Sequence, residues 1–224
     1  MISLIIIDFD DTIVENSELD YQSFKSTSMK FGVYYPSKKE LRLFRHKKIK
    51  EKEIIKLIEL KSNKKIKEYS KFRKRFLESY ESTRYLKLRP FLKNNLVFLK
   101  NKKMKIFIFT LRKNKKNIQR FLIDNNIDEL IDGIETAKKI DTKNEKIAIS
   151  EKMIMFDLIK KKNKLNSNNL ISIGDSFVDA HVANKFKVRH FSINIENFGE
   201  NEINFDNFKE LKELLTNELD NNLK

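Results

Sequence analysis

The chain has no cysteine among its 224 residues. Disulfides and thiolate metal sites are therefore excluded, and any metal site must use oxygen or nitrogen ligands. No stretch approaches the ~20 apolar residues that a membrane span needs. The apolar start of the chain ends at Asp8, too early for a signal peptide. We therefore expect a soluble cytoplasmic protein with no membrane partner.

The chain also has few acids relative to bases, so its formal net charge is +15. Such a balance is typical of nucleic-acid-binding proteins. It is also typical of a Lys-, Asn- and Ile-rich composition, and here the lysines are spread along the chain. We favour the compositional explanation and keep nucleic acid as an alternative partner. On either interpretation, positive potential attracts anionic substrates.

Short apolar runs predict buried parallel strands at 2–7, 106–109 and 170–173, with a less pure run at 188–193 and a weaker candidate at 131–134. Helical patterns separate most of these runs. Alternation of strands and helices predicts an α/β fold with a doubly wound, Rossmann-like parallel sheet.

The interval between the first two strands is different, because it has helical stripes and no strand pattern. One stripe predicts a helix through Ile66, Tyr69, Phe72, Phe76 and Tyr80. Ser17 is a candidate N-cap for an earlier helix. Pro90 indicates the return to the core. We therefore predict an all-helical subdomain at 14–89, inserted into a Rossmann-like core made of 1–13 and 90–224.

Two of the predicted strands end in acidic clusters. Asp8 and Asp10 follow the first strand, and Asp175 and Asp179 follow the strand at 170–173. Ligands of open α/β sheets bind at the carboxyl ends of the strands. Crowded carboxylates there are costly unless a hard divalent cation offsets them. Helix capping could explain either cluster alone but not both.

Thr110 ends the predicted strand at 106–109, where a hydroxyl and backbone N–H groups can hold a phosphate oxygen. Taken together with the acids, these residues resemble the motifs of the haloacid dehalogenase-like superfamily, which consists mostly of phosphatases. Its Asp-x-Asp-x-Thr motif is present as Asp8 to Thr12, and its Gly-Asp-x-x-x-Asp motif as Gly174 to Asp179. The helical insert is similar to the cap that follows the first motif in this superfamily.

The resemblance implies a magnesium-dependent phosphatase with an aspartyl-phosphate intermediate. It makes Asp8 the nucleophile and Asp10 the general acid and base. Mg²⁺ is then held by Asp8, the backbone carbonyl of Asp10, and Asp175, with Asp179 in support.

The resemblance also implies how the phosphoryl group is held. Thr110 binds it, and Thr12 orients the first loop. The superfamily's lysine matches Lys152, which we place just before a helix at 153–162, and Lys146 is the reserve candidate. Its charge would neutralise the nucleophile and the phosphoryl oxygens.

Some positions depart from the superfamily pattern. Asp11, Phe91 and Lys187 stand where glycine is usual. His181 follows the last motif, and we expect it to be a surface histidine rather than a ligand.

The substrate implied is a small phosphorylated metabolite. Alternatives are a phosphomutase, a nucleic-acid end phosphatase, or a non-catalytic binding protein with a vestigial site. Asp10 argues against dehalogenation, because the dehalogenases of this superfamily lack it. Cap residues that could meet an anionic substrate, although we expect most to face solvent, are Arg42, Arg45, His46, Arg73 and Lys74.

Overall fold

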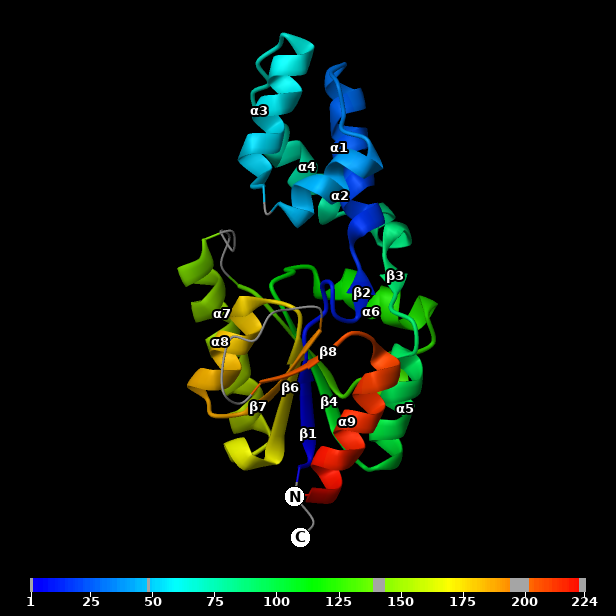
Figure 1. The fold of residues 1–224 in the computed structure, drawn as a ribbon, viewed down its shortest axis with the longest axis vertical. Helices are drawn as coiled ribbons and strands as arrows, with labels where there is room; N and C mark the ends of the chain where they lie inside the picture. The colour runs from blue at the N-terminus through cyan, green and yellow to red at the C-terminus, as the bar shows by residue number, and fades with distance from the viewer. Residues whose placement is uncertain (1, 48, 139–143, 194–201, 222–224) are drawn as a thin grey trace. The chain divides into compact units, whose positions relative to one another are not determined.

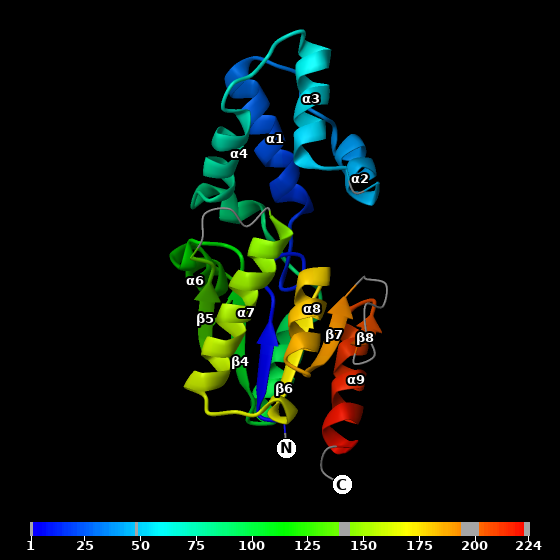
Figure 2. The same cartoon turned by 90° about the vertical axis from the view of Figure 1, so that its left-hand side faces the viewer.

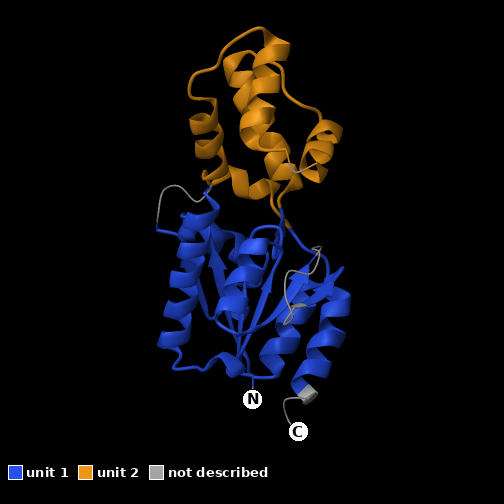
Figure 3. Cartoon of the chain, turned by 60° about the vertical axis from the view of Figure 1, so that its left-hand side comes forward, with its two compact units in different colours: residues 1–15, 88–224 blue, residues 16–87 orange. Residues whose placement is uncertain are grey.

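The structure is a computed structural model that describes residues 2–47, 49–138, 144–193 and 202–221. The chain divides into two compact units, one made of residues 1–15 and 88–224 and the other of residues 16–87 (Figure 3). None of the described helices combines the length and the apolar character that crossing a membrane requires.

The larger unit is built on a six-stranded sheet in which every neighbouring pair is parallel. The strand order is β5-β4-β1-β6-β7-β8. The apolar runs of the sequence supply the central strands, which are buried on both faces. The strands are β1 (Leu4–Ile7), β4 (Lys105–Thr110), β5 (Gly133–Thr136), β6 (Leu170–Gly174), β7 (Arg189–Ile193) and β8 (Glu202–Phe205).

Helices cover both faces of this sheet (Figures 1 and 2). On one face lie α7 (Glu145–Lys162) and α8 (Phe177–Lys185), and on the other lie α5 (Leu92–Asn101) and α9 (Phe208–Asn221). Helix α6 (Lys115–Asp124) and the 3₁₀ turn Asp128–Leu130 connect β4 to β5, and the 3₁₀ turn Ser167–Asn169 leads into β6. The predicted α/β, Rossmann-like fold is confirmed.

The position of β1 determines where a site can form. From β1 the chain builds outward through β4 and β5, then crosses back to β6 on the other side of β1. Ile7 is level with Ile108 of β4 and Ile173 of β6. The carboxyl ends of these three strands therefore meet at one edge, where the strand order reverses, which is where open α/β sheets bind ligands.

The smaller unit is helical. It contains α1 (Ser17–Phe31), α2 (Lys38–His46), α3 (Glu51–Ser62), α4 (Tyr69–Leu77) and the 3₁₀ turn Glu81–Tyr85. These helices bury an apolar cluster of their own, formed by Phe24, Leu41, Ile54, Ile58, Ile66 and Tyr69. Two short strands, β2 (Val14–Glu15) and β3 (Lys87–Leu88), pair where the chain passes between the units.

Several local predictions were wrong. Ser17 is the first residue of α1 rather than its N-cap, which is Asn16. The helix predicted through Ile66 and Tyr80 is shorter, and α4 leaves both residues outside. The helix that we began at residue 153 begins at Glu145.

Candidate active site

Asp8 lies at the point where β1 leaves the sheet. Its backbone N–H donates to the Ile173 carbonyl at 2.9 Å, which continues the sheet ladder by one residue. Three residues later, Asp11 has a positive φ of 53° and turns the chain. The Asp8 side chain is buried, with 5% of it exposed. The ladder and the turn together hold this carboxylate at the carboxyl edge of the central strand.

The second acidic cluster is shaped by Gly174 and by the start of α8. A Cβ at position 174 would lie 2.6 Å from Cβ and Cγ of Asp179, so glycine is needed for this close approach. Ser176 and Asp179 form a capping box. In it the Ser176 N–H donates to Asp179 Oδ2 at 3.2 Å, and the Asp179 N–H donates to Ser176 Oγ at 3.3 Å. The Ser176 hydroxyl also donates to Asp179 Oδ2 at 2.5 Å. Asp179 is thereby fixed and fully buried.

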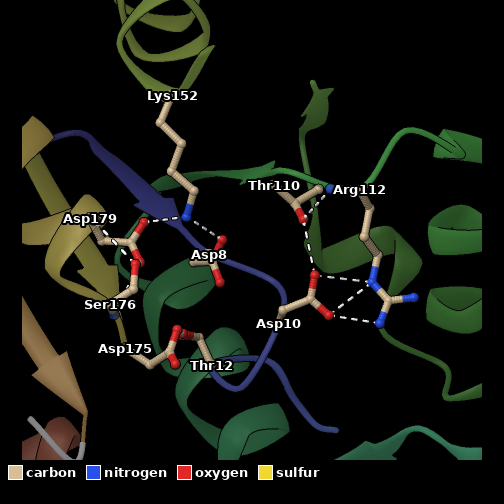
Figure 4. A network of polar contacts seen from close by, with 9 residues as sticks. All are labelled: Asp8, Asp10, Thr12, Thr110, Arg112, Lys152, Asp175, Ser176 and Asp179. Carbon is tan, nitrogen blue, oxygen red and sulfur yellow. Dashed lines mark hydrogen bonds and ion pairs between the residues drawn. The ribbon is translucent and has the colours of Figure 1, made fainter. Parts of the chain in front are cut away.

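The two acidic clusters come together, as the neighbouring positions of β1 and β6 require. Carboxylate oxygens of Asp8, Asp175 and Asp179 lie within 4.8 Å of one another. The Thr12 hydroxyl donates to Asp175 Oδ1 at 3.3 Å, which ties the loop after β1 to the loop after β6 (Figure 4). Three converging carboxylates are a donor set that suits a hard divalent cation.

Lys152 reaches this cluster from α7. Its Nζ lies 2.7 Å from Asp8 Oδ1 and also donates to Asp179 Oδ1 (Figure 4). Only 3% of its side chain is exposed. Lys146, the other candidate, is exposed at the first turn of the same helix. Lys152 lies inside α7 rather than before it, so the rigid helix body fixes the origin of its side chain.

The electrostatics of the cluster show an excess of negative charge. Burial, together with the charge of Asp179, raises the pKa of Asp175 to about 7. Burial also raises the pKa of Asp8 well above its usual range, and Lys152 offsets part of that effect. Burial opposes the charge of Lys152, but Asp179 and Asp8 outweigh it and raise the lysine pKa. One lysine therefore does not balance three carboxylates, and a divalent cation fits the remaining charge.

Asp10 faces away from this cluster, toward a residue that the sequence analysis missed. Arg112 Nε lies 2.9 and 3.0 Å from the two Asp10 carboxylate oxygens, and a terminal guanidinium nitrogen lies 2.7 Å from Oδ1. The Thr110 hydroxyl donates to Asp10 Oδ2 at 3.4 Å. The one available signal was the position of Arg112, two residues after a strand-ending threonine. Among 47 Lys and Arg residues it did not stand out.

Arg89 is the second residue that the sequence analysis missed. Its Nε and a terminal nitrogen donate to the Asp11 backbone carbonyl at 3.0 and 2.6 Å. Its backbone N–H donates to the Ile13 carbonyl at 3.0 Å. Arg89 thus holds the loop that follows Asp10 by binding Asp11, the residue with the left-handed backbone conformation.

The other candidates lie on α8 and in the helical unit. His181 is exposed on α8, with its ring centroid 5.7 Å from that of Phe177, and it lies outside the cluster of Asp8, Asp175 and Asp179. In the helical unit Arg42, Arg45 and His46 are exposed. Arg73 is buried and is an exception to our expectation that most of these residues face solvent. It pairs with Asp20 and with Glu51 and lies 4.1 Å over the Phe24 ring, so its role is inside that unit.

Comparison with solved structures shows the same fold throughout the chain. A predicted phosphoglycolate phosphatase from Haemophilus somnus 129PT matches with a TM-score of 0.73 at 18% identity, covering 96% of this chain and 98% of the other. A HAD-superfamily hydrolase of subfamily IA from Geobacter sulfurreducens PCA matches with a TM-score of 0.70 at 14% identity, covering 96% of each chain.

A third structure, CbbY from Rhodobacter sphaeroides in complex with phosphate, matches with a TM-score of 0.64 at 18% identity, covering 94% of this chain and 96% of the other. A search among curated proteins gave no significant match. At these identities the solved structures establish the fold alone.

The sequence itself identifies the family. A sequence model described as haloacid dehalogenase-like hydrolase matches residues 5–193, a range that begins within β1 and ends with β7. That range includes both acidic clusters, Thr110 and Lys152. The match extends over most of the 224 residues, and this chain therefore belongs to the haloacid dehalogenase-like hydrolase family.

Proposed function

We propose that this chain is a magnesium-dependent phosphatase that hydrolyses a small phosphate monoester through an aspartyl-phosphate on Asp8. The observation that carries the proposal is the convergence of Asp8, Asp175 and Asp179 within 4.8 Å, with Lys152 Nζ 2.7 Å from Asp8. A nucleophilic carboxylate, further acidic oxygens and a buried cation are the groups that phosphoryl transfer to an aspartate requires.

In the first half-reaction, an Asp8 carboxylate oxygen attacks phosphorus while the bond from phosphorus to the ester oxygen breaks. Asp10 gives a proton to the leaving oxygen, so the product leaves as an alcohol. Lys152 stays against Asp8 and offsets negative charge on the phosphoryl oxygens as the new bond forms.

In the second half-reaction, Asp10 takes a proton from a water molecule, whose oxygen attacks phosphorus. The bond between phosphorus and Asp8 breaks, inorganic phosphate leaves, and both carboxyl groups return to their starting states. Thr110 holds a phosphoryl oxygen in both steps, and Thr12 keeps Asp175 in place through its 3.3 Å hydrogen bond.

Asp8 and Asp175, with the backbone carbonyl of Asp10, would hold Mg²⁺, and Asp179 supports that set from the capping box with Ser176. When bound, Mg²⁺ would reduce the repulsion between the carboxylates and the incoming phosphoryl group. The raised pKa values of Asp8 and Asp175 favour this assignment, because both reflect buried negative charge that a cation relieves.

The substrate in this proposal is a small phosphorylated metabolite. One related structure was described as a predicted phosphoglycolate phosphatase and another was solved with phosphate bound. The helical unit, which we placed at 14–89 from sequence and which forms the compact unit 16–87, acts as a cap that selects the substrate. The core then performs the same transfer on every substrate.

The test is turnover of a generic aryl phosphate with and without a chelator. We expect activity to disappear in chelator and to return with Mg²⁺. Asp8→Asn replaces the nucleophilic carboxylate by a neutral amide and keeps the side-chain volume, so turnover should fall by about a thousandfold or more in a folded protein. Full activity in chelator, or near-normal turnover of folded Asp8→Asn, would contradict the proposal.

The same assay separates the alternatives. A phosphatase releases one inorganic phosphate for each substrate consumed, whereas a phosphomutase yields a phosphorylated isomer. A panel that contains both phosphorylated metabolites and end-phosphorylated oligonucleotides distinguishes a small-molecule enzyme from a nucleic-acid end phosphatase. A folded, metal-binding protein that hydrolyses nothing in the panel would favour the vestigial-site alternative.

A further inference from the structure

The candidate site contains two cations that face two carboxylates. Lys152 pairs with Asp8 in the interior, and Arg112 pairs with Asp10 nearer the surface (Figure 4). Only 3% of the Lys152 side chain is exposed, compared with 18% for Arg112 and 36% for Asp10. An anion that enters from solvent can therefore reach Arg112 more readily than Lys152.

The pairing of Arg112 with Asp10 occupies both partners. Three nitrogen-to-oxygen distances of 2.7–3.0 Å join the guanidinium to the two carboxylate oxygens, and Thr110 donates to one of them. Figure 4 shows the Asp10 carboxylate turned toward Arg112, while that of Asp8 is turned toward Lys152. Asp10 cannot contact a leaving oxygen at Asp8 without giving up part of this pairing.

Arg112 has other contacts that keep it at the site if Asp10 moves. Its backbone N–H donates to Thr110 Oγ1 at 3.2 Å, which fixes the loop after β4. Its guanidinium carbon lies 5.2 Å from the centroid of Phe9, a fully buried ring between the two aspartates in sequence. A cation over an aromatic face gains electrostatic attraction. These contacts with Thr110 and Phe9 keep the guanidinium beside the site while it exchanges one anion for another.

A carboxylate and a phosphate can replace each other on a guanidinium because both present two oxygens at a similar spacing. A guanidinium binds either group through two parallel N–H···O bonds. We propose that the Arg112 guanidinium is an anion-binding group of the site, which the Asp10 carboxylate holds in this structure and a phosphoryl group takes over. The exchange releases Asp10 toward Asp8, so Arg112 both binds the substrate and positions Asp10. This proposal rests on the proposed function only in taking a phosphate as the anion.

The test is a double-mutant cycle in which the affinity for phosphate is measured rather than the turnover. Inorganic phosphate is titrated calorimetrically, with Mg²⁺ present, into the wild type, Asp10→Asn, Arg112→Gln and the double variant. If Asp10 competes with phosphate for Arg112, Asp10→Asn should tighten phosphate binding about tenfold, the value of one charge-assisted hydrogen-bonded pair. In the Arg112→Gln background, the same change should alter affinity by about twofold at most, because only direct repulsion is then removed.

Arg189→Gln is the matched control. Arg189 forms an ion pair with Glu218 at 3.3 Å in the same unit and is the first residue of β7, at the end of that strand away from the carboxyl edge. It should leave phosphate affinity unchanged. An equal effect of Asp10→Asn in both backgrounds would overturn the exchange, as would the absence of phosphate binding in all four proteins.

The outcomes for the two proposals are separable. A positive cycle in a protein that hydrolyses no monoester would keep the anion exchange and reject the phosphatase. Additive effects in an active, magnesium-dependent phosphatase would reject the exchange alone. Arg112→Lys keeps the charge but loses the two-pronged geometry, so its phosphate affinity should lie between those of the wild type and Arg112→Gln.

Discussion

Three residues of this chain hold left-handed backbone conformations at positions where the superfamily pattern usually has glycine. Asp11, Phe91 and Lys187 have φ values of 53°, 63° and 54°. A left-handed conformation costs a residue with a Cβ about 1–2 kcal/mol. At Asp11 two hydrogen bonds from the Arg89 guanidinium to the Asp11 carbonyl offset part of that cost. At Lys187 the strain lies at the end of α8.

Lys187→Gly should stabilise the core unit. Lys187 ends α8 in a Schellman arrangement, in which its N–H donates to the Asn184 carbonyl and the Val188 N–H donates to the Ala183 carbonyl. Glycine keeps both bonds without left-handed strain, and its extra chain entropy offsets part of the gain. We expect the free energy of unfolding to rise by about 0.5–1 kcal/mol, measured by calorimetry.

Lys185→Gly is the matched control for that change. Lys185 is the same residue type, exposed, and in the last helical turn of α8 rather than in the left-handed position. Glycine there should lower stability by about 1 kcal/mol. If both substitutions changed the free energy of unfolding in the same direction, the φ value at Lys187 would not be what limits stability.

Residue patterns predicted part of the candidate site because parallel strands bring their carboxyl ends to one edge. Asp8 and Asp175 are adjacent for that reason, and a strand-end pattern finds them without coordinates. Arg112 and Arg89 are recognised only through their bonds to Asp10 and to the Asp11 carbonyl. Those bonds join residues 102 and 78 positions apart, a separation that carries no local signal.

Among the elements, burial decided which ones the sequence predicted. The central strands β1, β4 and β6 consist mainly of buried apolar residues, so they were evident. The edge strand β8 (Glu202–Phe205) alternates polar and apolar residues over four positions and was missed. Helix α2 buries only Leu41, so its sequence has no wide apolar stripe, and it was missed as well.

Tyr69 joins two helices of the smaller unit by a buried polar contact. It is 1% exposed at the start of α4, and its hydroxyl lies 2.7 Å from that of Ser28 and donates to the Phe24 carbonyl at 3.1 Å, both on α1. Burial raises the pKa of Tyr69 to about 12. The neutral hydroxyl is therefore part of what holds α1 against α4.

Tyr69→Phe should destabilise the helical unit by about 1–2 kcal/mol at pH 8, since it leaves buried polar groups without this partner. The contribution of the Tyr69 hydroxyl to the free energy of unfolding is fully present below the unfolded pKa of about 10. It declines as the pH rises toward the folded pKa of about 12. By pH 11 it should be smaller by about 1.4 kcal/mol.

Denaturant unfolding of Tyr69→Phe at pH 8 and pH 11 measures this change. Tyr35→Phe, at an exposed tyrosine of the same unit, is the control and should show neither effect. A difference between Tyr69→Phe and wild type that is the same at both pH values would mean that the Tyr69 hydroxyl is not protected from ionisation by folding.

At the scale of the whole molecule, positive charge is divided unequally between the two units. Residues 16–87 contain 21 Lys and Arg against 9 Asp and Glu, whereas the rest of the chain contains 26 against 23. The lysines are spread along the chain, but the excess of positive charge lies in the helical unit. The helical unit carries +12 of the net +15, and the unit that bears the acidic cluster is nearly balanced. Composition alone hides this division because it averages over both units.

This division gives a test of the cap role that does not depend on any single contact. If the helical unit meets the substrate first, its charge should speed the capture of a dianionic phosphate ester without changing the transfer itself. Replacing Lys39, Lys52 and Lys65 by Gln removes three exposed charges from that unit. We expect KM to rise about threefold at low ionic strength with kcat unchanged. Near 0.5 M salt the difference should vanish, since screening then acts within about 4–5 Å.

The control removes the same charge from the core, at the exposed residues Lys102, Lys162 and Lys185. Lys162 and Lys185 are the last residues of α7 and α8, and Lys102 follows the last residue of α5. Each of these helices is followed by a strand of the sheet, so its last turn lies toward the amino ends of the strands, away from the acidic cluster. Because the net charge of both triple variants is the same, an effect of total charge would raise KM equally in both. A rise confined to the helical-unit variant, and lost in salt, is what capture by the cap requires. Equal KM values for the two variants would show that residues 16–87 do not guide the substrate to Asp8.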